Sequence, residues 1–123
     1  MIVIDASAVL EMLKQTPIGL ELVEALDRQR LEAPHVIDLE VWSGLRRWVL
    51  REEMTLAAAE RALDSFLALP IRRYAHTPLL GEIWALRHNL TAYDAAYLAL
   101  ARSLRAELLT MDDGLRKLAA RKD

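Results

Sequence analysis

Hydrophobic residues fall along this chain in short apolar runs that alternate with longer stretches of helical spacing. The run Ile2–Ile4 is apolar and β-branched, which is typical of a fully buried parallel strand. Further strand patterns occupy residues 31–34, 71–75 and 107–110. Because strands alternate with helices, the pattern predicts an α/β fold with a parallel sheet covered by helices on both faces.

The helical stretches begin at recognisable start signals. Thr55 is a candidate N-cap, and Pro78 stands in the first turn of the helix that Thr77 opens. The predicted helices span residues 6–14, 16–30, 36–52, 55–67, 77–87, 92–104 and 113–120. No repeat, low-complexity segment or linker interrupts them, so residues 1–123 are predicted to form a single domain.

Charge and composition narrow the classes of function. The chain has 16 basic and 18 acidic residues and a formal net charge of −2, so any nucleic-acid contact must come from a local basic patch. It has no cysteine, which excludes disulfides, thiolate metal sites and cysteine nucleophiles. No apolar run approaches the ~18 residues of a membrane span, and the start MIVID does not resemble a signal peptide. We therefore expect a cytoplasmic protein without membrane contact.

Acidic residues stand where strand-like runs pass into helix-like ones: Asp5, Glu40, Asp94 and Asp112. In an open α/β sheet, the carboxyl ends of parallel strands and the helices that follow them line one shared crevice. Carboxylates that meet there repel one another strongly, and a divalent cation relieves the repulsion. Their oxygen atoms suit Mg²⁺ or Mn²⁺. The pattern therefore indicates a metal-dependent phosphodiesterase.

Helix capping explains three of these acids when each is taken alone. Asp5 and Asp112 stand where an N-cap would begin the next helix. Thr91 and Asp94 fit a capping box, with Asp94 at the third helical position. Only the conjunction of all the acids favours chemistry, because a capped fold would not need them at one edge of the sheet.

Glu40 lies inside its predicted helix and needs a different explanation. At 100° per residue it shares a stripe with Ser43, Gly44, Arg47 and Arg51, whereas nearly all other residues of this helix are apolar. A mostly buried helix with one polar stripe indicates that the stripe faces a water-filled groove. An ordinary solvated helix face is the alternative.

Four segments together carry a resemblance to a known family: MIVIDASAVL, APHVIDLEVWSGLRR, LTAYDAAYLALA and LLTMDDGLRKLA. They resemble the PIN-domain nucleases, and specifically the VapC toxins of bacterial and archaeal VapBC toxin–antitoxin pairs. The likeness spans nearly the whole chain, and TAYDAAYLALA is its most specific part. It implies a PIN-like three-layer α/β/α fold, with a short parallel sheet of four or five strands, and a Mg²⁺- or Mn²⁺-dependent endoribonuclease.

The resemblance also assigns roles to single residues. Asp5, Glu40, Asp94 and Asp112 match the family's acidic quartet, so they are expected to be both catalytic and metal-binding. Ser7 and Thr110 match the small polar neighbours, which could orient a carboxylate or a water molecule. Asp113 could share the role of Asp112, and Asp38 could substitute for Glu40.

Contacts to an RNA phosphate are expected from arginines near the acids. Arg47 is the first choice because it shares the stripe with Glu40, and Arg51 continues that stripe. The further candidates are Arg46, Arg72, Arg73, Arg87 and His88, although any one of them can equally be a solubilising surface charge. The histidines show no metal-ligand spacing to one another.

Partners are expected from an excess of apolar surface on the helix that carries Glu40. Trp42, Trp48, Val49 and Leu50 wrap more of this helix than one core contact needs. Deep burial is one explanation, and a homodimer face or an antitoxin groove is the other. The resemblance implies a VapB-type antitoxin, an RNA substrate, and a homodimer or a larger toxin–antitoxin assembly.

Two other classes of function remain as alternatives. One is a catalytically inactive interaction module on the same fold. The other is a receiver-type phosphoacceptor domain, which would need an aspartate after a central strand and a lysine after a late strand. The centre of this chain, VLREEMTLAAAERAL, is helical in pattern, and no lysine lies near residues 107–110.

Overall fold

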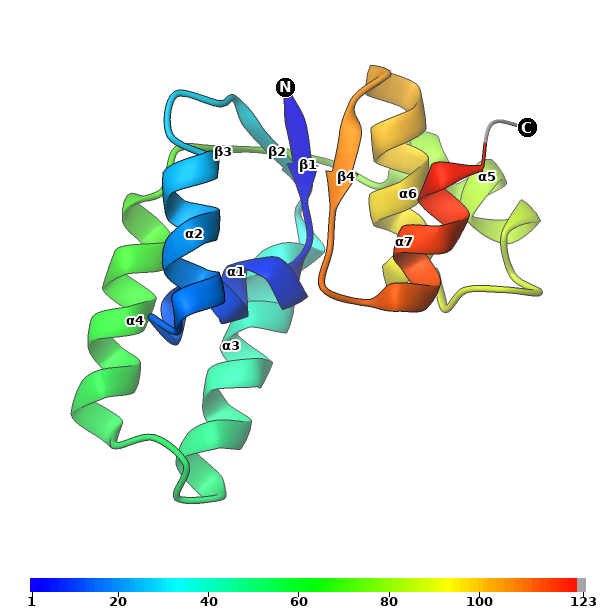
Figure 1. Ribbon diagram of the computed structural model, residues 1–123. Coiled ribbons are helices and arrows are strands. Elements are labelled where there is room, and N and C mark those ends of the chain that lie inside the picture. The colour runs from blue at the N-terminus through cyan, green and yellow to red at the C-terminus, as the bar shows by residue number, and fades with distance from the viewer. Residues whose placement is uncertain (122–123) are drawn as a thin grey trace.

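Parallel strands form the centre of the computed structural model, which describes residues 1–121 (Figure 1). The strands are β1 (Ile2–Ile4), β2 (Leu31–Pro34), β3 (Ile71–Tyr74) and β4 (Glu107–Leu109). They form a 4-stranded sheet in the order β3-β2-β1-β4, and every neighbouring pair is parallel. The predicted α/β class is therefore confirmed, and a fifth strand does not occur within residues 1–121.

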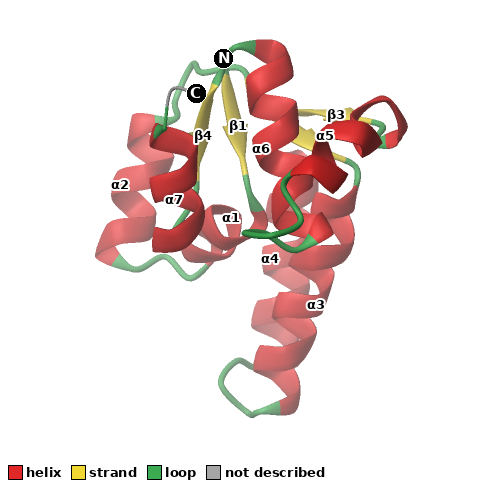
Figure 2. Cartoon of the chain, turned by 90° about the vertical axis from the view of Figure 1, so that its right-hand side faces the viewer, coloured by secondary structure: helices red, strands yellow, loops and turns green. Residues whose placement is uncertain are grey.

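Helices cover both faces of this sheet. They are α1 (Ala6–Leu13), α2 (Pro17–Ala25), α3 (Val36–Leu50), α4 (Leu56–Ala68), the 3₁₀ turn η1 (Thr77–Leu79), α5 (Leu80–Ala85), α6 (Ala92–Leu104) and α7 (Asp113–Ala120). In Figure 1, α1 to α4 lie on one side of the strands and α5 to α7 on the other. Figure 2 shows α6 running beside β1, with α5 next to α6 and with α7 beside β4. The predicted three-layer arrangement is thus present.

Helix α6 packs against the sheet and against α5 through different side chains. All residues from 95 to 101 are buried, and α6 contacts β1, β2 and β4. Tyr97 and Leu100 belong to the core cluster that contains the strand residues, whereas the alanines at positions 95, 96 and 99 pack with Ile83 of α5. This packing holds the N-terminus of α6 at the carboxyl ends of β1 and β4.

One predicted helix is shorter than the sequence pattern indicated. The pattern favoured a helix over residues 16–30, but α2 ends at Ala25. Arg28 adopts a left-handed backbone conformation with φ 68°, which turns the chain toward β2. Apolar spacing does not record such a turn, because it depends on backbone direction and not on side-chain polarity.

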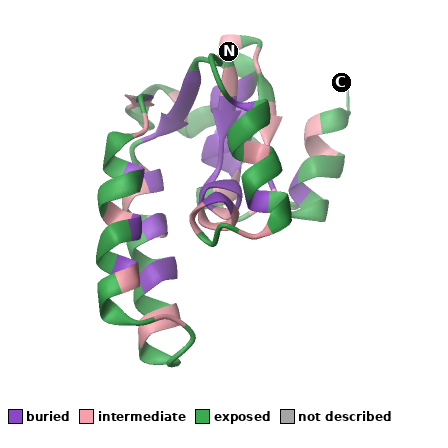
Figure 3. Cartoon of the chain, turned by 60° about the vertical axis from the view of Figure 1, so that its left-hand side comes forward, coloured by how far each residue is buried: buried purple, intermediate pink, exposed green. Residues whose placement is uncertain are grey.

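Helix α3 is less buried than its apolar composition predicted. Its fully buried residues are Ile37, Val41, Gly44 and Leu45. Leu39 and Leu50 are 70% and 64% exposed. The reason is geometric, since α3 and α4 form a long hairpin that extends past the sheet and is exposed along its outer surface (Figure 3).

The tryptophans of α3 divide between core and surface. Trp42 is 40% exposed and meets Phe66 of α4 edge-on, with ring centroids 6.1 Å apart. Trp48 is half-buried, and the Lys14 ammonium lies 4.7 Å from its ring centroid. These contacts tie α3 to α4 and to the end of α1. No helix within residues 1–121 combines the length and the apolarity that crossing a membrane requires.

Gly19 marks a close approach of α2 to α1, and its replacement should destabilise the fold. A Cβ at this position would lie 2.3 Å from the carbonyl oxygen of Glu11, a backbone atom that cannot move aside alone. We expect Gly19→Ala to lower the free energy of unfolding by about 1–3 kcal/mol, as overpacking usually does. Urea denaturation would measure the change. Gly81→Ala is the matched control, since a Cβ there meets nothing within 4 Å. Equal stability of the Gly19→Ala variant and the wild type would contradict the close approach.

Candidate metal centre at the carboxyl ends of the strands

The register of β1 and β4 brings Asp5 beside Thr110. Ile4 pairs with Leu109, and the Asp5 backbone N–H donates to the Leu109 carbonyl at 3.1 Å. The next residues on each strand therefore face one another, and the Thr110 hydroxyl donates to Asp5 Oδ2 at 2.5 Å. Asp5 is 4% exposed and Thr110 is 2% exposed. A buried carboxylate at the end of β1 is thus held by a hydroxyl at the end of β4.

The other oxygen of Asp5 is held by the start of α1. Asp5 Oδ1 accepts a hydrogen bond from the Ser7 hydroxyl at 2.7 Å and from the Ala8 N–H at 3.0 Å. Ser7 Oγ in turn accepts from the Met111 N–H at 2.9 Å. Asp5 therefore caps α1, as the capping explanation predicted, and it also anchors a network that joins both strand ends.

Asp112 and Asp113 differ in what they face. Asp112 caps α7 by accepting from the Leu115 N–H at 2.7 Å, and its own N–H donates to Thr110 Oγ1 at 3.0 Å. Asp113 instead pairs with Arg116 on the next turn of α7 at 3.2 Å. Asp112 is thereby tied to the network around Asp5, whereas Asp113 is turned toward solvent.

Asp94 enters the same crevice from the first turn of α6. Thr91 caps this helix by accepting from the Asp94 N–H at 3.2 Å. Partial burial raises the pKa of the Asp94 carboxyl above its ordinary value, and the charges of Asp112 and Asp5 raise it further. A neighbouring negative charge raises the pKa of a carboxyl only when it is close and poorly screened by water. Asp112 and Asp5 therefore lie near Asp94 in the same crevice.

Glu40 completes the cluster from α3. Burial raises the pKa of its carboxyl, the hydrogen bond from Tyr97 opposes this, and the charges of Asp94 and Asp5 add to the rise. The Tyr97 hydroxyl donates to Glu40 Oε1 at 2.5 Å. Burial first, and then the contact with Glu40, raise the pKa of Tyr97 above its ordinary value, so its hydroxyl keeps the proton that it donates.

Tyr97 is a functional residue that the sequence pattern did not single out. It stands three residues after Asp94 on α6 and therefore on the same helix face. That spacing was the available signal. Its partner Glu40 is 57 residues away on another helix, so only the fold could identify the contact.

Asp38 does not substitute for Glu40. Its two carboxylate oxygens share the single Nε–H of Arg73, at 2.9 and 3.0 Å, and Asp38 Oδ1 lies 2.7 Å from Arg73 Nη2. Asp38 and Arg73 thus form a two-pronged ion pair between α3 and β3, away from the acids at the strand ends. Arg73 is engaged in this pair, so its predicted phosphate contact is not supported.

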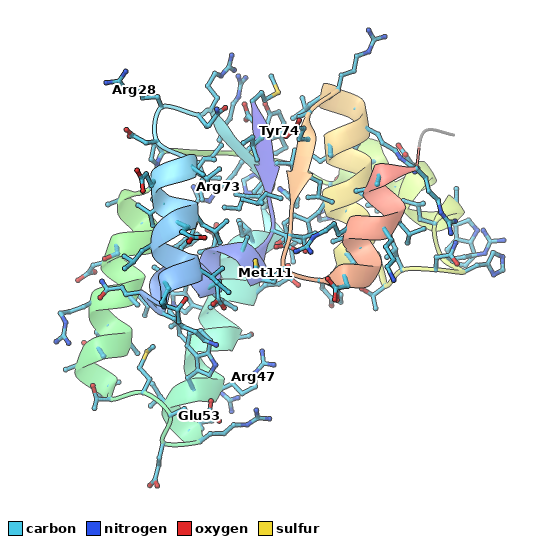
Figure 4. All side chains as sticks on the ribbon, in the orientation of Figure 1. Arg28, Arg47, Glu53, Arg73, Tyr74 and Met111 are labelled. Carbon is cyan, nitrogen blue, oxygen red and sulfur yellow. The ribbon has the colours of Figure 1, made fainter. Side chains whose placement is uncertain are left out.

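Most of the other residues that were candidates for phosphate contacts also lie apart from the acids. Arg72 packs over the Tyr74 ring at 5.4 Å, and Arg87 packs over the Trp84 ring at 4.8 Å. Arg46, Arg51 and His88 are exposed and form no ion pair or side-chain hydrogen bond with the acids within residues 1–121. Only Arg47 lines the same groove as Glu40. Figure 4 shows Arg47 projecting outward from α3 on the side of α7.

The donor set fits a hard divalent cation that keeps part of its water. The converging ligands are all carboxylates, which suit Mg²⁺ or Mn²⁺. Within residues 1–121 no three acidic or histidine side chains are already placed to hold an ion together. Mg²⁺ commonly binds through one or two carboxylates and retains several waters, so direct contacts from few acids and water-mediated contacts from the rest would suffice.

Removing one of these charges should stabilise the metal-free protein. Because the pKa of Asp94 is raised in the folded protein, folding favours the protonated carboxyl. The stabilising contribution of Asp94 is therefore fully present below the ordinary pKa and is lost as the pH rises through the raised native pKa. Asparagine removes the charge, and the Asp94 side chain makes no hydrogen bond within residues 1–121 that would be lost. Solvent screening keeps the gain near 0.5–1 kcal/mol, so we expect Asp94→Asn to raise the Tm by about 2–5 °C.

Thermal melts in EDTA across pH would test this expectation. The difference between Asp94→Asn and the wild type should be largest at neutral to mildly alkaline pH and should vanish in acid, where both side chains are uncharged. Asp64→Asn serves as a control, because Asp64 is an exposed acid on α4. A difference that grows as the pH falls would contradict the repulsion among these carboxylates.

Comparison with known proteins identifies the family of this chain. A family model described as PIN domain matches residues 2–121, nearly the whole chain. The chain belongs to the PIN-domain family.

Relatives within this family narrow the assignment. Ribonuclease VapC9 of Mycobacterium tuberculosis (strain ATCC 25618 / H37Rv) is 43% identical over 112 residues, which cover 91% of this chain and 86% of that protein. Ribonuclease VapC1 of the same strain is 43% identical over 115 residues, covering 92% and 86%. Within the PIN-domain family, the chain is of the VapC type.

A solved structure shows the same fold. Mycobacterium tuberculosis VapC20, described as a sarcin-ricin loop cleaving toxin, superposes with a TM-score of 0.72 and covers 96% of this chain and 95% of its own. Its sequence identity is 16%, so this likeness supports the architecture alone.

Proposed function

We propose that this protein is a metal-dependent endoribonuclease, the toxin of a VapBC-type toxin–antitoxin system. The observation that carries the proposal is the convergence of Asp5, Glu40, Asp94 and Asp112 from four separate elements. The charges of Asp112 and Asp5 raise the pKa of Asp94, and the charges of Asp94 and Asp5 raise the pKa of Glu40. Ribonuclease activity of the VapC type accords with relatives that are 43% identical over most of the chain. Dependence on Mg²⁺ or Mn²⁺ is our inference from the chemistry of the carboxylates.

Asp5 and Asp94 are the proposed principal ligands, with Asp112 and Glu40 completing the site directly or through water. When bound, the ion would supply Lewis-acid activation of a water molecule and neutralise charge at the phosphodiester. The protein contributes orientation. Thr110 and Ser7 hold the two oxygens of Asp5, and Tyr97 holds one oxygen of Glu40. Each hydrogen bond orients a carboxylate that is proposed to hold the ion.

An antitoxin partner is proposed for the exposed apolar surface between α2 and α4. A hollow of about 430 Å³ lies there, lined in part by Met12, Leu20 and Met54. The neighbouring large apolar side chains that remain exposed are Ile18, Leu20, Val23, Leu56 and Leu67. Apolar patches of this kind usually mark protein contacts, and a VapB-type antitoxin is the occupant that the family assignment favours.

Further features of the proposal concern assembly and location. We infer a homodimer, alone or within a larger complex with the antitoxin, because apolar side chains such as Trp42 and Leu50 stay exposed on α3. Light scattering on the purified protein would measure its mass in solution. We also expect the protein to act in the cytoplasm, where its RNA substrates would be present.

The function itself is tested by incubating the purified protein with total RNA. We expect cleavage with Mg²⁺ or Mn²⁺, no cleavage in EDTA, and recovery when the metal is restored. Mapping the cut ends would identify the RNA. A protein that stays inactive with both metals would overturn the nuclease proposal and favour the inactive interaction module instead.

A further inference from the structure

A groove leads away from the acids along α3 and has two chemically different ends. It encloses about 480 Å³ and runs between α1 and α3. Its acidic residue is Glu40, which lines it together with Ser7. Ser43 and Arg47 continue it along α3, and Tyr93 of α6 closes the other side. The groove therefore adjoins the proposed metal centre at Glu40, and an arginine and an aromatic ring also line it.

Exposed apolar side chains stand directly beside the acids in this groove. Tyr93 precedes Asp94 in the chain and is 61% exposed, and Leu39 precedes Glu40 and is 70% exposed. The Tyr93 hydroxyl makes no side-chain hydrogen bond within residues 1–121, and neither side chain belongs to the buried core. Because these large apolar side chains are exposed, they add little to the stability of the fold. Their position beside a charged site favours a ligand with an apolar face.

A second hollow lies on the far side of the same residues. It encloses about 400 Å³, and Val36, Leu39 and Tyr93 line both this hollow and the groove. Tyr93 therefore stands at the border of two adjoining spaces. A flat ring system in the groove could stack on the Tyr93 ring, and the second hollow would give it additional space.

Arg47 provides the opposite chemistry at the other end. It is exposed, and it makes no salt bridge or side-chain hydrogen bond with the part of the chain that the structure describes. From Glu40 to Arg47 the rise along α3 is about 10 Å, which keeps the guanidinium clear of the carboxylates. A free guanidinium at this distance suits a phosphate next to the one held at the metal centre.

We propose that the groove binds one unpaired nucleotide beside the scissile phosphate, with its base stacked on Tyr93 and a neighbouring phosphate on Arg47. This inference rests on the proposed nuclease function and names Tyr93 and Arg47 as the residues that would hold the unpaired nucleotide at that site. In an A-form duplex the base faces are stacked on one another and unavailable to a side chain. In an unpaired segment the base faces are free, and every base offers a face on which an aromatic ring can stack. Tyr93 would therefore favour single-stranded over double-stranded RNA.

The test measures binding of a fluorescein-labelled RNA of roughly 12 nucleotides, as a single strand and annealed to its complement. Fluorescence anisotropy is read in a Ca²⁺ buffer, since Ca²⁺ also takes oxygen ligands, and gels check that the RNA stays intact. Wild type should bind the single strand more tightly than the duplex. Tyr93→Ala should weaken single-strand binding by about 5- to 100-fold, and Tyr93→Phe should retain it.

Matched variants separate stacking from charge. Trp84→Ala removes an aromatic ring that is 68% exposed but does not line the groove, so its affinity should equal that of the wild type. Arg47→Ala should weaken single strand and duplex alike and lower the slope of log affinity against log salt by about 0.7, the value for one phosphate contact.

The outcomes distinguish this inference from the nuclease proposal. If the wild type cleaves RNA with Mg²⁺ but Tyr93→Ala binds and cleaves as well as wild type, the stacking inference is overturned and the nuclease stands. Equal affinity for single strand and duplex would overturn it as well. A change in the solution mass of Tyr93→Ala would assign Tyr93 to a protein interface instead. Absence of cleavage by the wild type is the separate failure of the nuclease proposal.

Discussion

Asp5→Asn and Asp94→Asn are each expected to lower RNA cleavage by at least about 100-fold. Losing an outer partner of a metal ligand already costs ~10–100-fold, and losing a ligand should cost no less. Asparagine keeps the shape of the side chain but removes the charge that would attract the ion. At Asp5 it can still accept hydrogen bonds from Ser7 and from the Ala8 N–H. Initial rates of cleavage in saturating Mg²⁺ would measure the loss.

The adjacent acids of α7 supply a matched control for this prediction. Asp112 is joined to the network through Thr110, whereas Asp113 pairs with Arg116 at the surface. We therefore expect Asp112→Asn to lose most activity and Asp113→Asn to stay within a few-fold of wild type. If Asp113→Asn were the more damaging change, the assignment of roles at the start of α7 would be wrong.

Thr110→Val should impair both stability and activity. The Thr110 hydroxyl is buried, donates to Asp5 Oδ2 and accepts from the Asp112 N–H. Valine has nearly the same shape but leaves the buried Asp5 carboxylate and the Asp112 N–H without this partner, which costs about 1–3 kcal/mol. Asp5 would also lose the contact that orients it, so we expect cleavage to fall by ~10–100-fold, chiefly in kcat.

Thr110→Ser separates the hydroxyl from the rest of the side chain. Serine restores the donor and acceptor, so activity should return to within a few-fold of wild type, although the lost methyl group costs some stability. Denaturant melts and steady-state kinetics on the same preparations would compare the variants. Full activity in Thr110→Val would show that Asp5 does not depend on this hydrogen bond.

The sequence pattern was sufficient to predict most of the elements because strong local signals mark them. The first strand is a short β-branched run, and Ala92–Leu104 and Asp113–Ala120 begin directly after capping residues. Such caps are short-range chemistry between a side chain and the backbone that follows it. Acids that cap helices after strands could therefore be expected to share one edge of a parallel sheet.

Long-range contacts explain what the pattern could not reveal. Asp38 and Glu40 are two residues apart on α3 and point in different directions. Which one joins the acids depends on Arg73, 35 residues beyond Asp38, and on Tyr97, 57 residues beyond Glu40. Helical periodicity describes the faces of a helix but does not say which neighbour each face will meet.

Glu32 is another carboxylate that the pattern did not bring out. It is 1% exposed in β2, its Oε1 lies 3.6 Å from Arg30 Nη2, and its Oε2 has no hydrogen-bond partner within residues 1–121. It pairs with Val3 in the middle of the sheet and not at the strand ends. A single buried acid weakens the apolar signal of its strand, which is why residues 31–34 were a poor strand pattern.

Titration of the protein with Mn²⁺, followed by calorimetry or by electron paramagnetic resonance, tests whether the carboxylates at the strand ends form one metal centre. We expect wild type to bind one or two Mn²⁺ ions, and we expect Asp5→Asn and Asp94→Asn each to weaken this binding by tenfold or more while Asp113→Asn does not. If both Asp5→Asn and Asp94→Asn bound Mn²⁺ as tightly as wild type, the metal would lie elsewhere and the carboxylates would not form its site.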